Sequence, residues 1–323
     1  MKMMMSERID VWTEGEYSYP LAFGFKPNFR TYIHPDDEIR PAVIVVPGGA
    51  YWVVSPTEAG IVAEKFYDFG FNAFVFTYTT NMLQMEPLKD QPMRDLGRAV
   101  RLIRKNAADY KIDPGKIALC GFSAGAHLCG SLCVHYGDVT ETDPELSAVS
   151  CRPDAAILSY PVITSGEKRH QGSFDALLGF QPTQEELQYY SLETQVTKDT
   201  PPCFLWQTAT DETVPVENSY LFASALKECG VTFEHHVFPR GVHGVSLADE
   251  RWAANDFGDP YTLEQTTNTV EAVKRGEVEV SEAAAAVLDW PENDNQPERE
   301  AMPEVAVWPL LARNFLELVF EGK

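Results

Sequence analysis

A serine in the stretch Gly121-Phe122-Ser123-Ala124-Gly125 is the residue of this chain best suited to act as a nucleophile. A short apolar run precedes it, as in a buried strand, and small and apolar residues follow it, as in a helix. A strand, a sharp turn and a helix built around G-x-S-x-G lift a serine hydroxyl clear of a sheet. The alternative is a tight strand–helix loop whose serine only caps the helix.

A serine hydroxyl is a weak nucleophile unless a base takes its proton, and that base works best when a buried acid orients it. We predict that His243 is the base, since Gly241 and Gly244 flank it in a loop after a predicted strand. The other histidines are His34, His127, His135, His170, His235 and His236. None of these lies in such a loop late in the chain, and a structural hydrogen bond is expected for His127.

Asp211 is the predicted acid, because it follows the apolar run 203–208 and precedes a predicted helix near 217–229. The alternatives are that Asp211 only caps the helix or forms an Asx turn, or that Asp199 is the acid instead. Asp199 is the weaker candidate, since two prolines place it before the strand. The order serine, aspartate, histidine is the one found in α/β-hydrolases.

Small residues in the loop 47–52 could bind the negative oxygen that forms when the serine attacks a carbonyl group. We predict that the N–H groups of Gly49, Ala50 and Ala124 do so; considered alone, the loop would fit an ordinary Gly-Gly turn equally well. The bulky side chains of Tyr51 and Trp52 are expected to wall a small acyl pocket beside it.

The elements that must position these residues alternate along the chain. Apolar runs typical of buried strands occupy 41–46, 73–78, 117–120, 155–160 and 203–208, and a further strand is predicted at 231–238. Predicted helices separate most of them, including one after Thr57, which we expect to be its cap, and one near 94–110, followed by a turn at 112–115. Alternation of this kind predicts an α/β fold, with a mostly parallel central sheet, helices on both faces and antiparallel strands near the amino terminus. The four candidate loops each follow a strand, so they should meet at one edge of the sheet.

Length and composition narrow the class of protein. The 323 residues are expected to form one domain, 1–323, and the formal charge of −22 argues against nucleic acid and anionic membranes as partners. The six cysteines form no CxxC pair; Cys129 and Cys133 are spaced like metal ligands, but a place in the core is favoured. We expect no metal, no cofactor, a cytoplasmic location and a small acyl ester as substrate, with a homodimer possible.

Residues 249–304 form a compositional insert before a final predicted helix that contains Trp308. Fifteen acidic and four basic residues give it a formal charge of −11, half of the total. Helical pieces are predicted near 263–273 and 281–288. The aromatic residues Trp252, Phe257, Tyr261 and Trp290 could stack on a sugar or pack the insert onto the body. The insert is therefore expected to be a lid or dimer element, or else a solvated acidic excursion.

Several segments together resemble the α/β-hydrolase esterases related to hormone-sensitive lipase, and more narrowly the bacterial carbohydrate acetyl-esterase and acetyl-xylan-esterase-like branch. The segments are 46–51, 121–128, 157–162, 210–215 and 238–248. The resemblance covers 9–248 and the last helix, and it assigns nucleophile, acid and base to Ser123, Asp211 and His243. One departure is that the common H-G-G-G motif reads Pro-Gly-Gly-Ala from Pro47.

The resemblance implies a serine carboxylester hydrolase that removes acetyl groups from small acylated carbohydrates. A serine peptidase or an arylformamidase on the same scaffold is an alternative, since fold alone does not choose the substrate. A binding module with a vestigial site is the alternative outside catalysis.

Overall fold

The sheet is the central element of the computed structural model, which describes residues 5–280 and 299–322. Its eight strands lie in the order β1-β2-β4-β3-β5-β6-β7-β8. They are β1 (Met5–Asp10), β2 (Asn28–Tyr32), β3 (Arg40–Val46), β4 (Asn72–Thr77), β5 (Ile112–Phe122), β6 (Ala155–Ser159), β7 (Cys203–Thr208) and β8 (Phe233–Phe238). Strands β1 and β2 pair antiparallel, β2 also pairs antiparallel with β4, and all other pairs are parallel.

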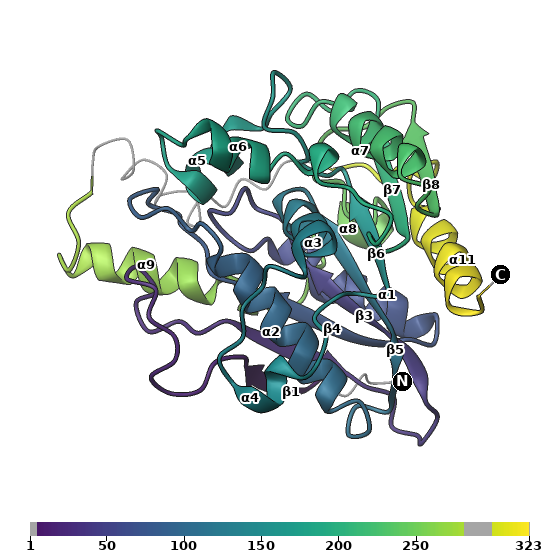
Figure 1. Ribbon diagram of the computed structural model, residues 1–323, viewed down its shortest axis with the longest axis horizontal. Helices are drawn as coiled ribbons and strands as arrows, with labels where there is room; N and C mark the ends of the chain where they lie inside the picture. The colour runs from purple at the N-terminus through teal and green to yellow at the C-terminus, as the bar shows by residue number, and fades with distance from the viewer. Residues whose placement is uncertain (1–4, 281–298, 323) are drawn as a thin grey trace.

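Helices cover both faces of this sheet, so the predicted fold class is confirmed (Figure 1). The helices are α1 (Gly60–Asp68), α2 (Gln91–Lys105), α3 (Ala124–His135), α4 (Pro144–Ser147), α5 (Gln171–Leu178), α6 (Gln184–Tyr189), α7 (Glu217–Glu228), α8 (Glu250–Ala253), α9 (Glu264–Lys274) and α11 (Trp308–Phe320). Short 3-10 turns are η1 (Pro56–Glu58), η2 (Leu192–Thr194) and η3 (Tyr261–Leu263). Helices α2, α3 and α7 share one apolar core with the sheet, whereas α1 and α11 share the other.

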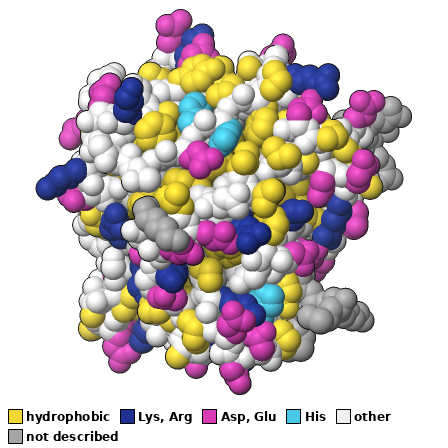
Figure 2. Space-filling model, turned by 90° about the vertical axis from the view of Figure 1, so that its right-hand side faces the viewer, with side chains coloured by type: hydrophobic (Ala, Val, Ile, Leu, Met, Phe, Trp, Pro, Cys, Tyr) yellow, Lys and Arg dark blue, Asp and Glu magenta, His cyan; other side chains and the backbone are white. Residues whose placement is uncertain are grey.

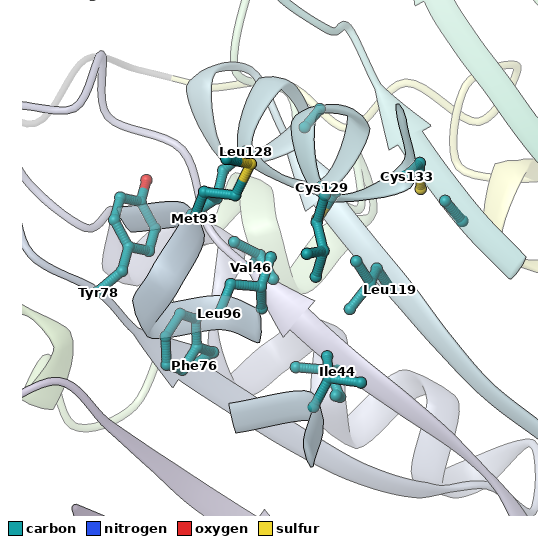
Figure 3. Packing of buried hydrophobic residues seen from close by; sticks show 14 of the residues in the cluster. Ile44, Val46, Phe76, Tyr78, Met93, Leu96, Leu119, Leu128, Cys129 and Cys133 are labelled. Carbon is teal, nitrogen blue, oxygen red and sulfur yellow. The ribbon is translucent and has the colours of Figure 1, made fainter. Parts of the chain in front are cut away.

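The apolar strands supply both cores because successive side chains point to opposite faces. In β3, Ile44 and Val46 belong to the core beneath α2 and α3, while Val43 and Val45 belong to the core beneath α1 and α11. Figure 3 shows the first core, in which side chains of β3, β4 and β5 meet those of α2 and α3. Continuous burial of this kind is why these runs could be recognised as strands from the sequence.

Cys129 and Cys133 lie on α3 and point into this core (Figure 3), and both are fully buried. Their four-residue spacing therefore reflects one buried helix face. Over residues 5–280 and 299–322, no three His, Cys, Asp or Glu side chains cluster so that they could hold a metal ion.

Two local predictions are wrong. Thr57 does not cap the helix after β3: it lies in η1, and α1 begins after Ala59 without a side-chain cap. Residues 112–115 are not a separate turn either, because they extend β5, which pairs with β3 across a register shift.

The insert packs partly onto the body. Gln265 of α9 accepts a hydrogen bond from the Thr80 N–H at 2.8 Å and donates to the Thr80 carbonyl at 2.8 Å. The ring of Tyr261 faces Arg30, and Trp252 and Phe257 both face Arg299, so these three aromatic residues pack within the protein. The predicted helix 281–288 and Trp290 lie outside the described residues.

The surface beside β8 and α11 mixes hydrophobic with acidic and basic side chains (Figure 2). Tyr220 and Leu221 of α7, and Leu310 and Leu318 of α11, are among the exposed large apolar residues of the chain. Among the described helices, none combines the length and the apolar character that crossing a membrane requires.

Candidate active site

The four loops singled out from the sequence meet at one edge of the sheet. They follow β3, β5, β7 and β8, and these four strands run parallel within one block of the sheet. Their carboxyl ends therefore point the same way, which is where open α/β sheets bind ligands. Strand β6 ends between them, so residues after β6 also reach this edge.

Ser123, His243 and Asp211 form a continuous hydrogen-bonded chain. The distance from Ser123 Oγ to His243 Nε2 is 2.8 Å, and that from His243 Nδ1 to Asp211 Oδ2 is 2.7 Å. The Asp211 carboxylate is fully buried, while 18% of the His243 side chain stays exposed. The geometry suits proton transfer from a serine hydroxyl to an imidazole that a carboxylate orients.

The second oxygen of Asp211 is also occupied. Its Oδ1 accepts hydrogen bonds from the N–H groups of Thr213 and Val214, both at 2.9 Å. These bonds are the Asx turn considered as an alternative role. Oδ2 faces His243 and also accepts a 3.5 Å hydrogen bond from the Gln207 side chain. Hydrogen bonds thus hold both oxygens of the Asp211 carboxylate.

The turn at Ser123 is strained in the way that the sequence motif indicates. Ser123 has φ 52° and ψ −118°, a conformation that non-glycine residues rarely adopt, and it directly precedes α3. Gly125 in the first turn of α3 lies against β3, since a Cβ there would come within 2.2 Å of the Val46 carbonyl oxygen. This close approach brings the loop after β3 alongside the serine.

That loop presents unused N–H groups. Gly49, Ala50 and Tyr51 have φ angles of 120°, 57° and 61°, and the loop curls so that the Trp52 and Val53 N–H groups bond to the Gly49 carbonyl. Among the described residues, the N–H groups of Gly49 and Ala50 donate to no protein acceptor. Consecutive free N–H groups in left-handed backbone form a concave site that suits an anion.

A cavity of about 560 Å³ opens directly beside Ser123 and His243. Its lining includes Gly49, Ala50 and Trp52 as well as Ser123 and His243, so five of the predicted site residues face it. The indole N–H of Trp52 donates to the Gly172 carbonyl at 3.1 Å, which fixes the ring as one wall.

Tyr51 does not line this cavity, and its predicted role in a pocket wall is wrong. Its side chain points into the core, where its hydroxyl lies 2.8 Å from Nδ1 of His127. The left-handed backbone at Tyr51 turns two adjacent bulky residues in opposite directions, which the sequence does not reveal. His127 also bonds through Nε2 to the Tyr190 carbonyl, and burial lowers its pKa to about 4, so its expected structural role is confirmed.

Three further residues, two in the cavity lining and one behind it, were not singled out from the sequence. His170 lines it with Nδ1 bonded to the Ser173 hydroxyl at 2.8 Å, and burial and the neighbouring His243 lower its pKa. Glu58 also lines it, and Tyr160, which follows β6, packs its ring edge-on against His243 at 5.0 Å. A lone histidine in a loop and a glutamate near a helix start gave no motif from which to find them.

A second cleft, of about 910 Å³, adjoins the first cavity at His243. Thr213, His243 and Gly244 line both spaces, so the two are neighbours around the imidazole. The insert contributes Arg299 and Glu300 to the second cleft. One end of the insert therefore lies at the rim of the site, as its place in the sequence suggests.

Comparison with known proteins identifies the family to which this chain belongs. The family model described as BD-FAE matches residues 32–226, which include Ser123, Asp211 and the loop after β3. This chain belongs to the BD-FAE family. BD-FAE is a family of α/β-hydrolase esterases, and the match ends before His243.

Individual relatives point the same way as the BD-FAE match. An endo-1,4-beta-xylanase B of Butyrivibrio fibrisolvens is 50% identical over 266 residues, which are 82% of this chain and 42% of that protein. An acetylxylan esterase of Xylanibacter ruminicola is 28% identical over 75% of this chain and 48% of its own length. This chain thus spans about half or less of the curated relatives that it matches.

Among solved structures, an acetyl ester-xyloside bifunctional hydrolase from Caldicellulosiruptor lactoaceticus superposes with a TM-score of 0.70. It is 36% identical to this chain, and the match covers 84% of this chain and 97% of that one. The two proteins therefore share a fold over most of this chain.

Proposed function

We propose that this protein is a serine carboxylester hydrolase that removes acetyl groups from small acylated carbohydrates of the xylo-oligosaccharide type. The observation that carries the proposal is the hydrogen-bonded chain from Ser123 through His243 to Asp211 beside free N–H groups and an open cavity. Nucleophile, base, orienting acid and oxyanion donors are the parts that acyl transfer requires.

In the proposed reaction, Ser123 Oγ attacks the ester carbonyl carbon while its proton moves to His243 Nε2. The carbonyl oxygen becomes an oxyanion, to which the N–H groups of Gly49, Ala50 and Ala124 donate. The imidazolium, stabilised by Asp211, then gives its proton to the departing alcohol oxygen. Water next attacks the acyl-serine with His243 as base, which releases acetate and restores Ser123.

The carbohydrate part of the proposal is supported by the relatives whose names concern xylan or xylosides. The name of the xylanase relative does not say which activity belongs to the matched part, because this chain spans only 42% of that protein. Cleavage of a glycosidic bond usually needs two carboxyl groups that flank it. Among the described residues that line the cavity beside Ser123, Glu58 alone carries one, and both its oxygens already accept hydrogen bonds.

The proposal is tested with a substrate panel on the purified chain. It should contain an acetylated xylo-oligosaccharide, p-nitrophenyl acetate, an N-acyl amino acid anilide and an N-formyl arylamine, with Ser123→Ala as the blank. Highest kcat/KM on the acetylated sugar supports the proposal. Highest kcat/KM on the anilide or the formamide favours the peptidase or the arylformamidase instead, and no turnover at all favours a binding module.

We expect acetyl esters to be better substrates than octanoyl esters. The apolar wall of the cavity is formed by Trp52, Val53 and Met82, and Val270 and Val273 of the insert pack behind it. Trp52→Ala should raise the octanoate-to-acetate ratio of kcat/KM by about tenfold, because burying two extra methylene groups is worth about 1.6 kcal/mol. A wild-type rate that climbs with chain length would instead indicate a lipase-like pocket.

The second cleft is proposed to hold the sugar, which places Arg299 near the leaving group. Arg299→Ala should lower kcat/KM on the acetylated xylo-oligosaccharide by about tenfold, as expected for one charge-assisted hydrogen bond, and leave p-nitrophenyl acetate unchanged. Arg275→Ala is the matched control, since Arg275 pairs with Glu271 and Glu277 at the end of α9. Equal effects of Arg299→Ala on both substrates would contradict this role.

Three expectations from the sequence stay predictions: that residues 1–323 form a single domain, that the protein can form a homodimer, and that it is located in the cytoplasm.

A further inference from the structure

Glu58 is a buried carboxylate in the wall of the active site that the proposed reaction does not use. It ends η1, just after the loop that carries Gly49 and Ala50, and only 4% of it is exposed. Its Oε2 accepts a hydrogen bond from the Gly48 N–H at 2.7 Å, and its Oε1 accepts one from the Tyr160 hydroxyl at 2.6 Å. A buried charge is costly unless it is hydrogen-bonded in this way.

The bond to Gly48 fixes the start of the loop that presents the free N–H groups. Gly48 lies directly on the serine turn, since a Cβ there would come within 2.6 Å of the Phe122 carbonyl oxygen and 2.9 Å of Ser123 Cβ. The N–H of Gly48 is taken by Glu58, so those of Gly49 and Ala50 are the next two along the chain. The carboxylate thereby sets the direction in which the following peptide groups leave Gly48.

The bond to Tyr160 reaches the loop that carries His243. The Tyr160 hydroxyl accepts a hydrogen bond from the Ser246 N–H at 3.1 Å, and its ring packs edge-on against the His243 ring. Ser246 lies three residues after His243, and its hydroxyl donates to the Thr57 carbonyl at 2.7 Å, next to Glu58. The histidine loop is therefore held to the segment that contains Glu58 by one direct bond, to Thr57, and by a second connection through Tyr160.

The hydrogen-bond pattern is that of an ionised carboxylate. The Gly48 N–H can only donate, and Tyr160 uses its proton toward Glu58 while it accepts from Ser246. Burial raises the pKa of Glu58, whereas the bonds from Tyr160 and Gly48 and the nearby His243 oppose that rise. Each oxygen of Glu58 thus accepts one hydrogen bond from a protein donor, and these two bonds tie the carboxylate to Gly48 and Tyr160.

We infer that Glu58 is a positioning residue that holds the oxyanion loop and the His243 loop in register with Ser123. The inference rests on the proposed function, and it concerns alignment in the transition state. Oxyanion donors and the base matter most once charge has developed, so misalignment should lower kcat more than it raises KM. Loss of one oxyanion donor costs about 10²–10³ in rate in other enzymes, and indirect loosening of two should cost about 10- to 100-fold.

Glu58→Gln is the sharpest variant because it keeps the side-chain volume. Its amide oxygen can still accept from the Gly48 N–H, but its NH₂ then faces the Tyr160 hydroxyl, which loses its acceptor. We expect kcat for p-nitrophenyl acetate to fall about 10- to 100-fold with KM within about threefold. The inhibition constant of methylboronic acid, which forms a tetrahedral adduct with a serine, should rise in parallel with the loss of kcat. Tyr160→Phe should shift both quantities in the same direction and tests the link if Glu58→Gln does not fold.

Asp95→Asn is the matched control, since Asp95 is also a buried carboxylate with several hydrogen bonds. It lies on α2 and bonds to Trp12, Gln91 and Thr79, and none of these residues lines the cavity beside Ser123. This variant should lower the melting temperature and leave kcat per folded molecule and boronate inhibition unchanged.

If the wild-type protein is active and Glu58→Gln leaves both kcat and boronate inhibition unchanged, the inference is wrong but the proposed function stands. The same holds for Tyr160→Phe if Glu58→Gln does not fold. A loss confined to KM, or one that Asp95→Asn reproduces per folded molecule, overturns the inference as well. A wild-type protein that hydrolyses no ester and is not labelled at Ser123 by a fluorophosphonate overturns the proposed function, and the inference with it.

Discussion

Ser123→Ala and His243→Ala are each expected to lower kcat/KM for p-nitrophenyl acetate by about 10⁴-fold or more, because serine and base act as a unit in other serine hydrolases. The 2.8 Å contact between Ser123 Oγ and His243 Nε2 is the proton path that either change removes. Both side chains lie at the end of the sheet and outside the two apolar cores, so the fold should survive.

Circular dichroism and the melting temperature provide the control for these two variants. Each should keep the wild-type spectrum, since the left-handed turn at residue 123 accepts alanine about as well as serine. Near wild-type turnover by a folded, carefully purified Ser123→Ala protein would show that another group is the nucleophile.

Asp211→Asn should lower kcat by about 10⁴-fold, the loss seen for the same change in another serine hydrolase. The amide oxygen would have to remain toward the Thr213 and Val214 N–H groups, which both need an acceptor. Its NH₂ would then donate to Nδ1 of His243, so that the imidazole proton moves to Nε2. That tautomer cannot accept the proton of Ser123.

Asp199→Asn is the matched control for the acid. Asp199 lies in the exposed loop before β7, where its carbonyl accepts a hydrogen bond from Arg152. Its replacement should change kcat less than about twofold, as is usual for surface substitutions. If Asp199→Asn were the slower of the two variants, the acid would have to be reassigned to that loop.

The sheet and the four loops could be predicted because most of the central strands contain a continuous apolar run that ends in an unusual loop. Val43, Ile44 and Val45 point alternately to the two faces of the sheet, and all three are buried. Burial on both faces is typical of a mostly parallel sheet that helices cover on each side. Once the sheet is parallel, the loops after its strands share one edge. The proximity of Ser123, Asp211 and His243 follows from that topology without any knowledge of side-chain contacts.

Side-chain direction within a loop could not be predicted in the same way. Tyr51 and Trp52 are neighbours in sequence, but left-handed backbone sends Tyr51 to His127 and leaves Trp52 in the cavity wall. In the sequence, Glu58 is an ordinary acidic residue before a helix. Its partners Gly48 and Tyr160 lie elsewhere in the chain, so no local pattern links them to it. Pairings of this kind depend on tertiary contacts, for which the sequence carries no local signal.

The most direct test of the account is to identify the residue that becomes acylated. The wild-type protein and Ser123→Ala are mixed with p-nitrophenyl acetate, quenched in acid within milliseconds, digested and mapped by mass spectrometry. We expect an acetyl group on Ser123 in the peptide that contains Gly121–Gly125, and none there in Ser123→Ala. An acetyl group on a different residue that forms and decays at the rate of turnover, or rapid turnover in Ser123→Ala, would contradict the assignment of Ser123 as the nucleophile.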